Sequence, residues 1–253
     1  MVNRFTRRQA LQAVTAGTVA LSHTGQAAAE QPAAAEQGEG ACVLMAEATE
    51  GPFYFDPKLE RRDITEGRPG APLNLALTII EAGPCTPITN ARVDVWHCDA
   101  DGLYSGYARQ DTNDTSTKGQ TFLRGTQTTG SDGRVTFETI YPGWYPGRTP
   151  HIHVKILLDQ KTIVTAQMYF PELLSRRIYG ERDPYTARGN TPDTTNSNDG
   201  IFKSSGGESG GVMLAIAGVG DVLTGSLVIA IDRSRTSAQG GWMQWLRGKI
   251  GPN

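Results

Sequence analysis

The sequence predicts an all-β fold, a β-sandwich of mainly antiparallel strands with long loops that carry the functional residues. Two observations predict it: short β-branched and aliphatic runs recur along the chain, and turn signals such as Ser131-Asp132-Gly133 separate most of them. With 253 residues and 38% hydrophobic content, the chain can bury one sizeable core. The expected strands are residues 73–80, 91–98, 134–140, 151–158, 162–170, 212–218 and 223–231.

Residues 1–29 indicate a twin-arginine export signal. Arg7 and Arg8 precede an apolar run that reaches Leu21, and small residues follow it. An amphipathic first helix is the alternative, but the run has few polar residues and no charged ones. Residues 30–41 lack large apolar side chains and are expected to form a disordered spacer. We therefore expect an exported protein, either periplasmic or secreted.

The charge balance bears on the partners of the chain. Its formal net charge is −2, and removal of a signal with three arginines and no acidic residue leaves the mature chain more acidic. No basic stripe remains to neutralise phosphates, so a nucleic-acid partner is not expected. The apolar run is too short to span a bilayer, so no membrane partner is expected either. A homo-oligomer is compatible with this composition.

We expect one domain over residues 42–235, followed by a C-terminal tail over 236–253. The tail contains Trp242 and Trp245 and is expected to be a packing or partner segment. Residues 173–179 are expected to form a short helix. The stretch 180–211 is rich in Asn, Asp, Thr, Ser and Gly, which predicts a long loop that is functional or mobile.

The chain has three cysteines, Cys42, Cys85 and Cys98. In an oxidising compartment this number predicts one disulfide and one free thiol. We interpret strands 73–80 and 91–98 as a hairpin that turns through residues 82–90, which separates Cys85 from Cys98. Cys42 is then the expected partner of one of the two. The alternative is that all three are small buried hydrophobic residues.

The segment Tyr141 to His153, YPGWYPGRTPHIH, contains the strongest chemical signal. Side chains alternate faces along a strand, so His151 and His153 point the same way and can reach one metal ion, whereas Ile152 faces the other side. Taken alone, such a pair is more simply two polar residues on an exposed strand face. The proline- and glycine-rich stretch before it presents Tyr145 from a loop.

A second tyrosine, Tyr104, lies upstream in GLYS, beyond a turn at Asp101-Gly102. Together with Tyr145 and the two histidines it makes a set of two phenols and two imidazoles. Phenolates are hard anionic donors, and a phenol with a pKa of about 10 needs a strong Lewis acid to ionise at neutral pH. Zinc and blue-copper sites prefer His, Cys and carboxylate ligands, so ferric iron is the natural match.

The motifs GLYS, PGWYPGRTPHIH and AQMYFP resemble those of the intradiol ring-cleaving dioxygenases, and the resemblance covers roughly residues 48–231. It implies a non-haem Fe(III) bound by Tyr104, Tyr145, His151 and His153. It also implies a catechol-type substrate that O2 cleaves between the two hydroxylated carbons, giving a cis,cis-muconate-type product. In this scheme the loop tyrosine Tyr145 leaves when substrate binds, and Tyr104 remains.

The same resemblance suggests further site residues. Arg148 would lie over the substrate ring, and Gln167 would lie near that arginine and the oxygen site. Phe53 and Tyr54 would line the pocket mouth, although both fit equally well as core aromatics. The loop from Tyr145 to His151 is shorter than in protocatechuate enzymes, and a dimerisation region like that of catechol dioxygenases is absent. Which catechol is used therefore stays open, and export favours larger or substituted rings.

Two other interpretations remain. The chain could be a secreted, non-enzymatic β-sandwich that binds carbohydrate or another partner, with an incidental histidine pair. It could also hold zinc or copper through His151, His153 and His97 in a hydrolase or redox site. We expect His97, at the end of a strand, to be a hydrogen-bonded core residue instead. Core positions are likewise expected for Tyr107, Tyr141, Tyr179 and Tyr185.

Overall fold

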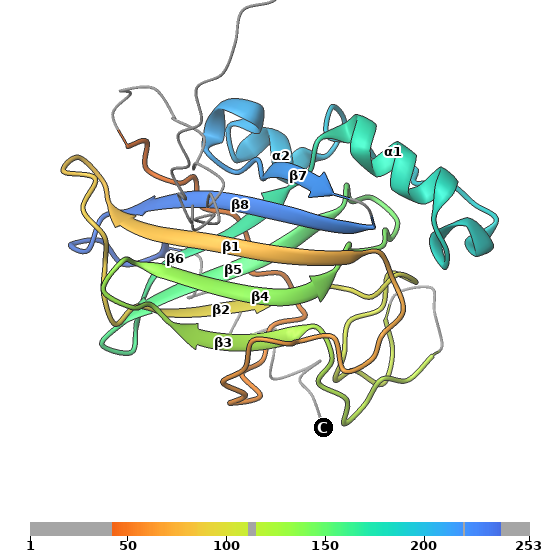
Figure 1. Cartoon of the computed structure of the whole chain (residues 1–253), viewed down its shortest axis with the longest axis horizontal. Helices are drawn as coiled ribbons and strands as arrows, with labels where there is room; N and C mark the ends of the chain where they lie inside the picture. The colour runs from red at the N-terminus through yellow and green to blue at the C-terminus, as the bar shows by residue number, and fades with distance from the viewer. Residues whose placement is uncertain (1–41, 111–114, 220, 239–253) are drawn as a thin grey trace, which may run out of the picture. The chain divides into compact units, whose positions relative to one another are not determined.

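The structure is a computed structural model that describes residues 42–110, 115–219 and 221–238. The expected export signal and spacer, and most of the expected tail, lie outside these residues. Two four-stranded sheets stack face to face, with β1, β4 and β8 in front of β2, β5 and β6 in the view of Figure 1. The predicted all-β sandwich is therefore confirmed.

The first sheet has the order β4 (Arg134–Ile140), β1 (Pro72–Glu81), β8 (Val222–Ile231) and β7 (Ala215–Val219). The second has the order β3 (Arg124–Thr128), β2 (Arg92–Trp96), β5 (His151–Leu158) and β6 (Lys161–Tyr169). Every neighbouring pair is antiparallel except β1 and β8, which are parallel. The seven predicted strands are all present.

Strand alternation builds the core between the sheets. On β1, three leucines are at most 1% exposed: Leu73, Leu75 and Leu77. Pro72, which precedes them, and Asn74, which lies between the first two, face solvent. From the second sheet, β5 presents Ile152, Val154 and Ile156 to the same core, and each is 0% exposed. Burial of such aliphatic side chains supplies about 1.5–3 kcal/mol each, so the core holds β5 firmly in place.

The other face of β5 is also buried, which is unusual for a sheet with antiparallel neighbours. The cover is the N-terminal segment 45–56, which crosses the outer face of the second sheet. The Ala48 N–H donates to the oxygen of Thr165 on β6 at 3.0 Å, and Lys155 on β5 pairs with Glu50 at 2.5 Å. The residues on this face of β5, His151 and His153 among them, are therefore removed from water.

Two expectations about connections are corrected, and one strand was not predicted. β3 was not predicted, because its sequence RGTQT has no aliphatic residue and contains Gly125. Strands β1 and β2 do not form a hairpin, because they belong to different sheets. The stretch 180–211 is not all loop: it contains η1 (Tyr185–Arg188), α2 (Gly200–Ser204) and η2 (Gly207–Gly210).

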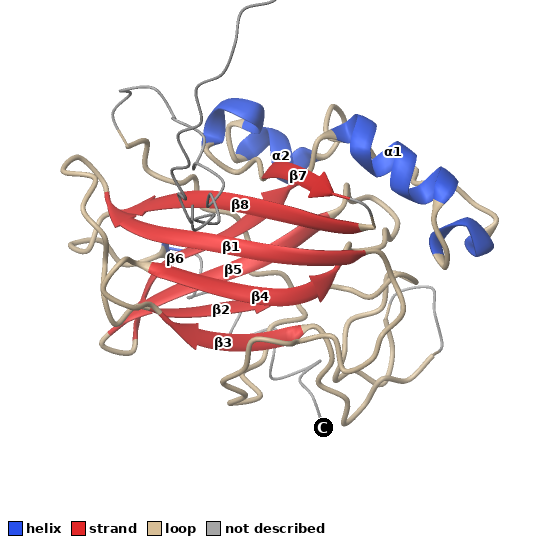
Figure 2. Ribbon diagram, viewed as in Figure 1, coloured by secondary structure: helices blue, strands red, loops and turns tan. Residues whose placement is uncertain are grey.

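The expected short helix is present as α1 (Glu172–Glu181), and the helices lie at the side of the sandwich near β7 (Figure 2). No helix among the described residues is both long and apolar enough to cross a lipid bilayer. Cys42 and Cys85 form the disulfide, and Cys98 is a free, buried thiol. Cys42 therefore takes part in the disulfide, as expected. The hairpin from which this was inferred is absent, because β1 and β2 belong to separate sheets.

Candidate active site

Strand β5 brings the two histidines together at the centre of the second sheet. In the register, His153 is paired with Trp96 on β2 and with Gln167 on β6. The imidazole of His153 stacks on the indole of Trp96, with centroids 4.6 Å apart and planes inclined by 10°. His151 is two residues away on the same face, and both side chains are 2% exposed. The strand thus fixes their separation and orientation.

Tyr104 lies in the loop after β2 and is held rigidly. Its N–H donates to Gln110 at 2.7 Å, and its carbonyl oxygen accepts from the side chains of Gln110 and Thr117, each at 2.6 Å. The phenol ring stacks against Phe53, with centroids 4.7 Å apart. With 1% exposure and its backbone hydrogen-bonded on both sides, Tyr104 has little freedom to move.

Tyr145 is held less firmly. It is half-buried, and the two residues after it, Pro146 and Gly147, are exposed. The loop approaches the Tyr104 loop closely at Gly102, where an added Cβ would lie 2.3 Å from the carbonyl oxygen of Trp144. The glycine is required there, because its φ is +86° as well. The close contact of this loop therefore precedes Tyr145, and the turn that follows is exposed, with the N–H of Gly147 donating to Asp193 at 3.2 Å.

The four polar side-chain atoms of these residues converge on one point. The Tyr104 hydroxyl lies 3.3 Å from that of Tyr145, 3.4 Å from Nε2 of His151 and 3.1 Å from Nε2 of His153. Nε2 of His151 lies 3.1 Å from the Tyr145 hydroxyl and 3.2 Å from Nε2 of His153. Atoms with this spacing surround a centre about 2 Å from each, which is the usual distance from a transition metal to nitrogen and oxygen ligands.

The protonation state of the two histidines suits metal binding. Nδ1 of His151 lies 2.8 Å from the carbonyl oxygen of Thr149, which can only accept, so Nδ1 carries the proton and Nε2 presents a lone pair. Burial, with the charge of Arg148 nearby, lowers the pKa of both His151 and His153 well below the ordinary value. Both imidazoles are neutral, as metal ligands must be.

The phenols need a strongly charged cation. Burial is the main cause that raises the pKa of Tyr104 and of Tyr145 above the ordinary value, so without a metal both hydroxyls keep their protons. A trivalent ion at the centre would reverse this balance, because a bound cation is the largest local charge in such a site. Two neutral imidazoles and two phenols therefore fit Fe(III) as a donor set.

The alternative with His97 as a third histidine ligand is not supported. Nδ1 of His97 lies 2.7 Å from the carbonyl oxygen of Cys98, and Nε2 lies 2.7 Å from the hydroxyl of Thr139. Both ring nitrogens are thus used, and His97 is 0% exposed, as expected for a core residue. In the part of the chain that the structure describes, no three His, Cys, Asp or Glu side chains group as a metal site. The tyrosines expected in the core are buried: Tyr107, Tyr141, Tyr179 and Tyr185.

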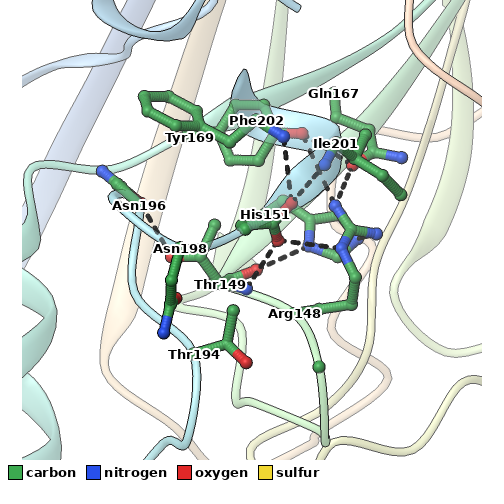
Figure 3. Close-up of polar contacts among 12 residues, drawn as sticks. Arg148, Thr149, His151, Gln167, Tyr169, Thr194, Asn196, Asn198, Ile201 and Phe202 are labelled. Atoms are coloured by element: carbon green, nitrogen blue, oxygen red, sulfur yellow. Dashed lines mark hydrogen bonds and ion pairs between the residues drawn. The ribbon is translucent and has the colours of Figure 1, made fainter. Parts of the chain in front are cut away.

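Arg148 lies against the four-atom cluster and is fixed from two sides. One guanidinium nitrogen, Nη2, donates to Oε1 of Gln167, which also accepts from the hydroxyl of Tyr169 at 2.9 Å. The amide nitrogen of Gln167 donates to the carbonyl oxygen of Thr49 at 2.9 Å. Nη1 of Arg148 lies 3.4 Å from Nε2 of His151. Figure 3 shows Arg148 beside His151, with Gln167 and Tyr169 around it.

One residue of this site, Asp199, is not predicted from the sequence. It immediately precedes α2, and its carboxylate accepts from Nε of Arg148 and from the N–H of Thr149, each at 2.9 Å. Burial raises the pKa of this carboxyl. The charge of Arg148 and the bonds from backbone N–H groups lower it by more than burial raises it, so the pKa is below the ordinary value. No local motif marks this residue, because its partners lie about fifty positions away in the sequence.

A cavity of about 260 Å³ opens next to the cluster. Its lining includes Phe53, Tyr145, Arg148 and His153. Tyr54, which the sequence placed with Phe53 at the pocket mouth, is not among the lining residues. Its hydroxyl instead donates to Asp94 at 2.8 Å, and its ring packs against Trp96. Of the two neighbours, the structure places only Phe53 at this cavity.

Comparisons with known proteins show the family of this chain. A family model described as Dioxygenase matches residues 50–176, half of the chain. The solved structure of an intradiol ring-cleavage dioxygenase from Tetranychus urticae is 34% identical and superposes with a TM-score of 0.71. The match covers 78% of this chain and 98% of that one. The chain belongs to the intradiol ring-cleavage dioxygenase family.

Other similar proteins are more distant in sequence. The dioxygenase domain of a dioxygenase carbohydrate-binding protein fusion from Streptomyces sp. SirexAA-E is 26% identical, with a TM-score of 0.53 over 75% of this chain and 98% of that one. Chlorocatechol 1,2-dioxygenase from Rhodococcus opacus is 28% identical over 163 residues, 54% of this chain and 57% of the relative. The chain spans about half the length of the curated relatives it matches.

Proposed function

We propose that this chain is a non-haem Fe(III) dioxygenase that opens catechol-type rings between the two hydroxylated carbons. The reaction adds both atoms of O2 to the ring, so that catechol gives cis,cis-muconate with no other reductant. The observation that carries the proposal is the cluster of Tyr104, Tyr145, His151 and His153 beside a cavity that Arg148 lines. Membership of the family supports the reaction class.

Fe(III) held by these four side chains would supply the Lewis acid that ionises a bound catechol and makes its ring reactive toward O2. The protein holds the donors in place for it. The histidines are fixed by β5 and by the bond from His151 to Thr149, and Tyr104 by Gln110 and Thr117. These ligands keep their positions before and after substrate binds.

Tyr145 is the ligand suited to leave. It is half-buried, and the turn after it is exposed, so the side chain can move without disturbing the core. Its phenolate oxygen would accept one of the two protons that the incoming catechol loses on binding, and the second would pass to solvent through the cavity. Tyr104 cannot take this part, because its backbone is tied to Gln110 and Thr117 and its ring is stacked on Phe53.

Arg148 provides a fixed positive charge at the cavity. Burial lowers the pKa of this guanidinium, but the nearby Tyr145 and Asp199 raise it more, so it stays charged. A cation held in place beside the ring stabilises the negative charge that builds there during oxygen attack. Pro52, Phe53 and Ile201 line the same cavity with apolar surface that excludes water.

A second hollow of about 170 Å³ supports a substituted substrate. It shares Phe53 and Tyr145 with the first cavity, and its remaining lining includes the polar residues Asp101, Arg188 and Asn190. Movement of Tyr145 would join the two spaces. We therefore propose that catechols with a polar substituent are accepted, the ring near Arg148 and the substituent toward Arg188.

The export signal in residues 1–29 leads us to propose that the enzyme acts in the periplasm or outside the cell. The disulfide between Cys42 and Cys85 supports this location, because such bonds persist in oxidising compartments. Fractionation of cells that express the full chain tests it. Replacement of Arg7 and Arg8 by lysine should keep the protein in the cytoplasm, whereas the unchanged chain should be found outside it.

Spectroscopy and oxygen uptake test the reaction. Purified protein loaded with Fe(III) should absorb visible light through tyrosinate-to-iron charge transfer, and anaerobic catechol should shift this band. Admission of air should then consume one O2 per catechol. A colourless protein with no bound iron and no oxygen uptake would contradict the proposal and favour the non-enzymatic sandwich.

A further inference from the structure

Asp199 is a buried carboxylate whose two oxygens have different partners. It is 1% exposed and stands at the N-cap of α2 (Gly200–Ser204). Oδ1 accepts from the N–H groups of Ile201 and Phe202, at 2.8 and 2.9 Å. Oδ2 accepts from Nε of Arg148 and from the N–H of Thr149. One oxygen thus caps the helix, and the other belongs to the active-site loop.

The bond from Asp199 decides which edge of the Arg148 guanidinium faces the cluster. Asp199 takes Nε and Gln167 takes Nη2, so Nη1 is left toward the cavity, 3.4 Å from Nε2 of His151. The guanidinium is planar and its five N–H donors have fixed directions, so acceptors at these two positions hold the whole group. Without Asp199, the contacts that remain to the guanidinium among the described residues are those with Gln167, Tyr169 and His151.

The same oxygen also reaches His151 through the backbone. Oδ2 holds the N–H of Thr149, and the carbonyl of Thr149 accepts the Nδ1 proton of His151 at 2.8 Å. A single carboxylate oxygen therefore fixes both the arginine beside the ring and the residue that sets the histidine tautomer. Figure 3 shows Arg148, Thr149 and His151 grouped below Ile201 and Phe202.

We propose that Asp199 is a positioning residue of the active site, which orients Arg148 toward the substrate and, through Thr149, orients His151. The inference rests on the proposed function, since it assigns Asp199 a role in that reaction. The alternative is that Asp199 only caps α2. The two roles use different oxygens of the carboxylate. Capping of α2 needs only Oδ1, whereas positioning of Arg148 and Thr149 needs Oδ2.

Side chains with a single acceptor separate the two roles. Asn and Ser are as good as Asp at an N-cap. Asn, however, has one oxygen and one NH2 group, so an amide that caps α2 turns its NH2 toward the donors of Arg148 and Thr149. Ser can cap the helix but is too short to reach Arg148 as well. Asp199→Asn and Asp199→Ser should therefore keep the fold and lose the arginine contact.

Asn198 offers a matched control in the same segment. Its side-chain oxygen accepts from the N–H and the hydroxyl of Thr195, at 2.7 and 3.3 Å, so it holds the turn before α2 and bonds neither Arg148 nor Thr149 there. Asn198→Ala should lower the thermal midpoint, because it removes these two bonds. Its Kd for the substrate analogue should stay within about 3-fold of the wild type.

The experiment uses the full chain loaded with Fe(III) and 4-nitrocatechol as the anaerobic binding probe. Both Asp199 variants should bind iron and fold, as circular dichroism shows, yet their Kd for the probe should rise by about 10- to 100-fold. A double-mutant cycle with Arg148→Gln completes the test. If Asp199 acts through Arg148, adding Asp199→Asn to the Arg148→Gln variant should change the Kd for the probe by less than about 3-fold.

The outcomes are distinguishable. Probe affinity equal to the wild type in both Asp199 variants, or equal losses of probe affinity in Asn198→Ala, would overturn the positioning role and leave the dioxygenase proposal standing. Losses that simply add in the double variant would mean that Asp199 does not act through Arg148, and would overturn the proposed orientation of Arg148 by Asp199. A wild-type protein that binds neither iron nor the probe would overturn the proposed function, and this role with it.

Discussion

Nδ1 of His151 lies 2.8 Å from the backbone oxygen of Thr149, two residues earlier in the same chain segment. This contact determines the tautomer, because a carbonyl oxygen can only accept, and it turns Nε2 toward the hydroxyls of Tyr104 and Tyr145. The end of β5 and the loop before it thus prepare a ligand before any metal binds. The proposed binding of Fe(III) depends on this pre-formed geometry.

The two cluster tyrosines should differ in importance for the metal. Tyr104→Phe removes an anchored donor and should lower iron content at least 10-fold together with the visible band. Tyr145→Phe removes the donor suited to leave, so it should retain more iron and show a shifted band. Metal analysis and absorption spectra check this, with Tyr141→Phe as the control, because its hydroxyl contacts Ser175 and not the cluster. Equal spectra for all three variants would contradict the assignment of the ligands.

Arg148→Gln should lower kcat/KM for catechol by about 10²- to 10³-fold, because it removes a fixed charge that stabilises the developing anion. Iron content should stay close to that of the wild type, since Arg148 is not one of the four donors. Arg176→Gln, on the exposed face of α1, is the control and should leave the kinetics unchanged. Steady-state oxygen uptake measures kcat/KM for both variants. A normal kcat/KM in Arg148→Gln would mean that the arginine has no part in the reaction.

The sequence alone predicted much of this arrangement. Strand β5 could be predicted because HIHVKILL combines β-branched residues with a fixed alternation, which placed His151 and His153 on one face and Ile152 on the other. Tyr104 and Tyr145 were predicted only through their motifs, because nothing in strand periodicity brings together residues from two loops. Long-range placement of that kind is set by the packing of the whole sandwich.

Other features could not be read from local pattern. The sequence of β3, Arg124–Thr128, is polar, and this segment is a strand because it pairs with β2 and because Gly125 fits against Ile64, where a Cβ would lie 2.5 Å away. Helix α2 has five residues, too few for a periodic stripe. Asp199 looked like part of a polar loop, since its arginine partner lies 51 positions earlier.

The alternation on β5 also makes a prediction about stability. Ile152 stands between the two histidines and is 0% exposed in the core. Ile152→Ala should lower the free energy of unfolding by about 2–5 kcal/mol, and Ile152→Val by about 0.5–1.5 kcal/mol. Urea unfolding of the metal-free protein measures both. Val228→Ala on β8, where the valine is 39% exposed, is the control with a small effect. A cost below 1 kcal/mol for Ile152→Ala would mean that β5 is not packed as described.

The disulfide should contribute measurably to stability. Cys42 and Cys85 are 43 positions apart, and closing a loop of that size restricts the unfolded chain by about 2–4 kcal/mol. Replacement of both by serine should lower the free energy of unfolding by that amount. Dithiothreitol should destabilise the wild type and leave the double variant unaffected. Equal sensitivity of the two proteins to the reductant would place the bond elsewhere.

The central claim is that the Tyr104, Tyr145, His151 and His153 cluster opens a catechol between its hydroxylated carbons. The most direct test is mass spectrometry of the product formed by the iron-loaded protein from catechol under ¹⁸O2. The expected product is a cis,cis-muconate whose two carboxyl groups each contain one labelled oxygen, and the Tyr104→Phe variant should give no product. Recovery of intact catechol, or of a ring-opened aldehyde, would contradict the claim.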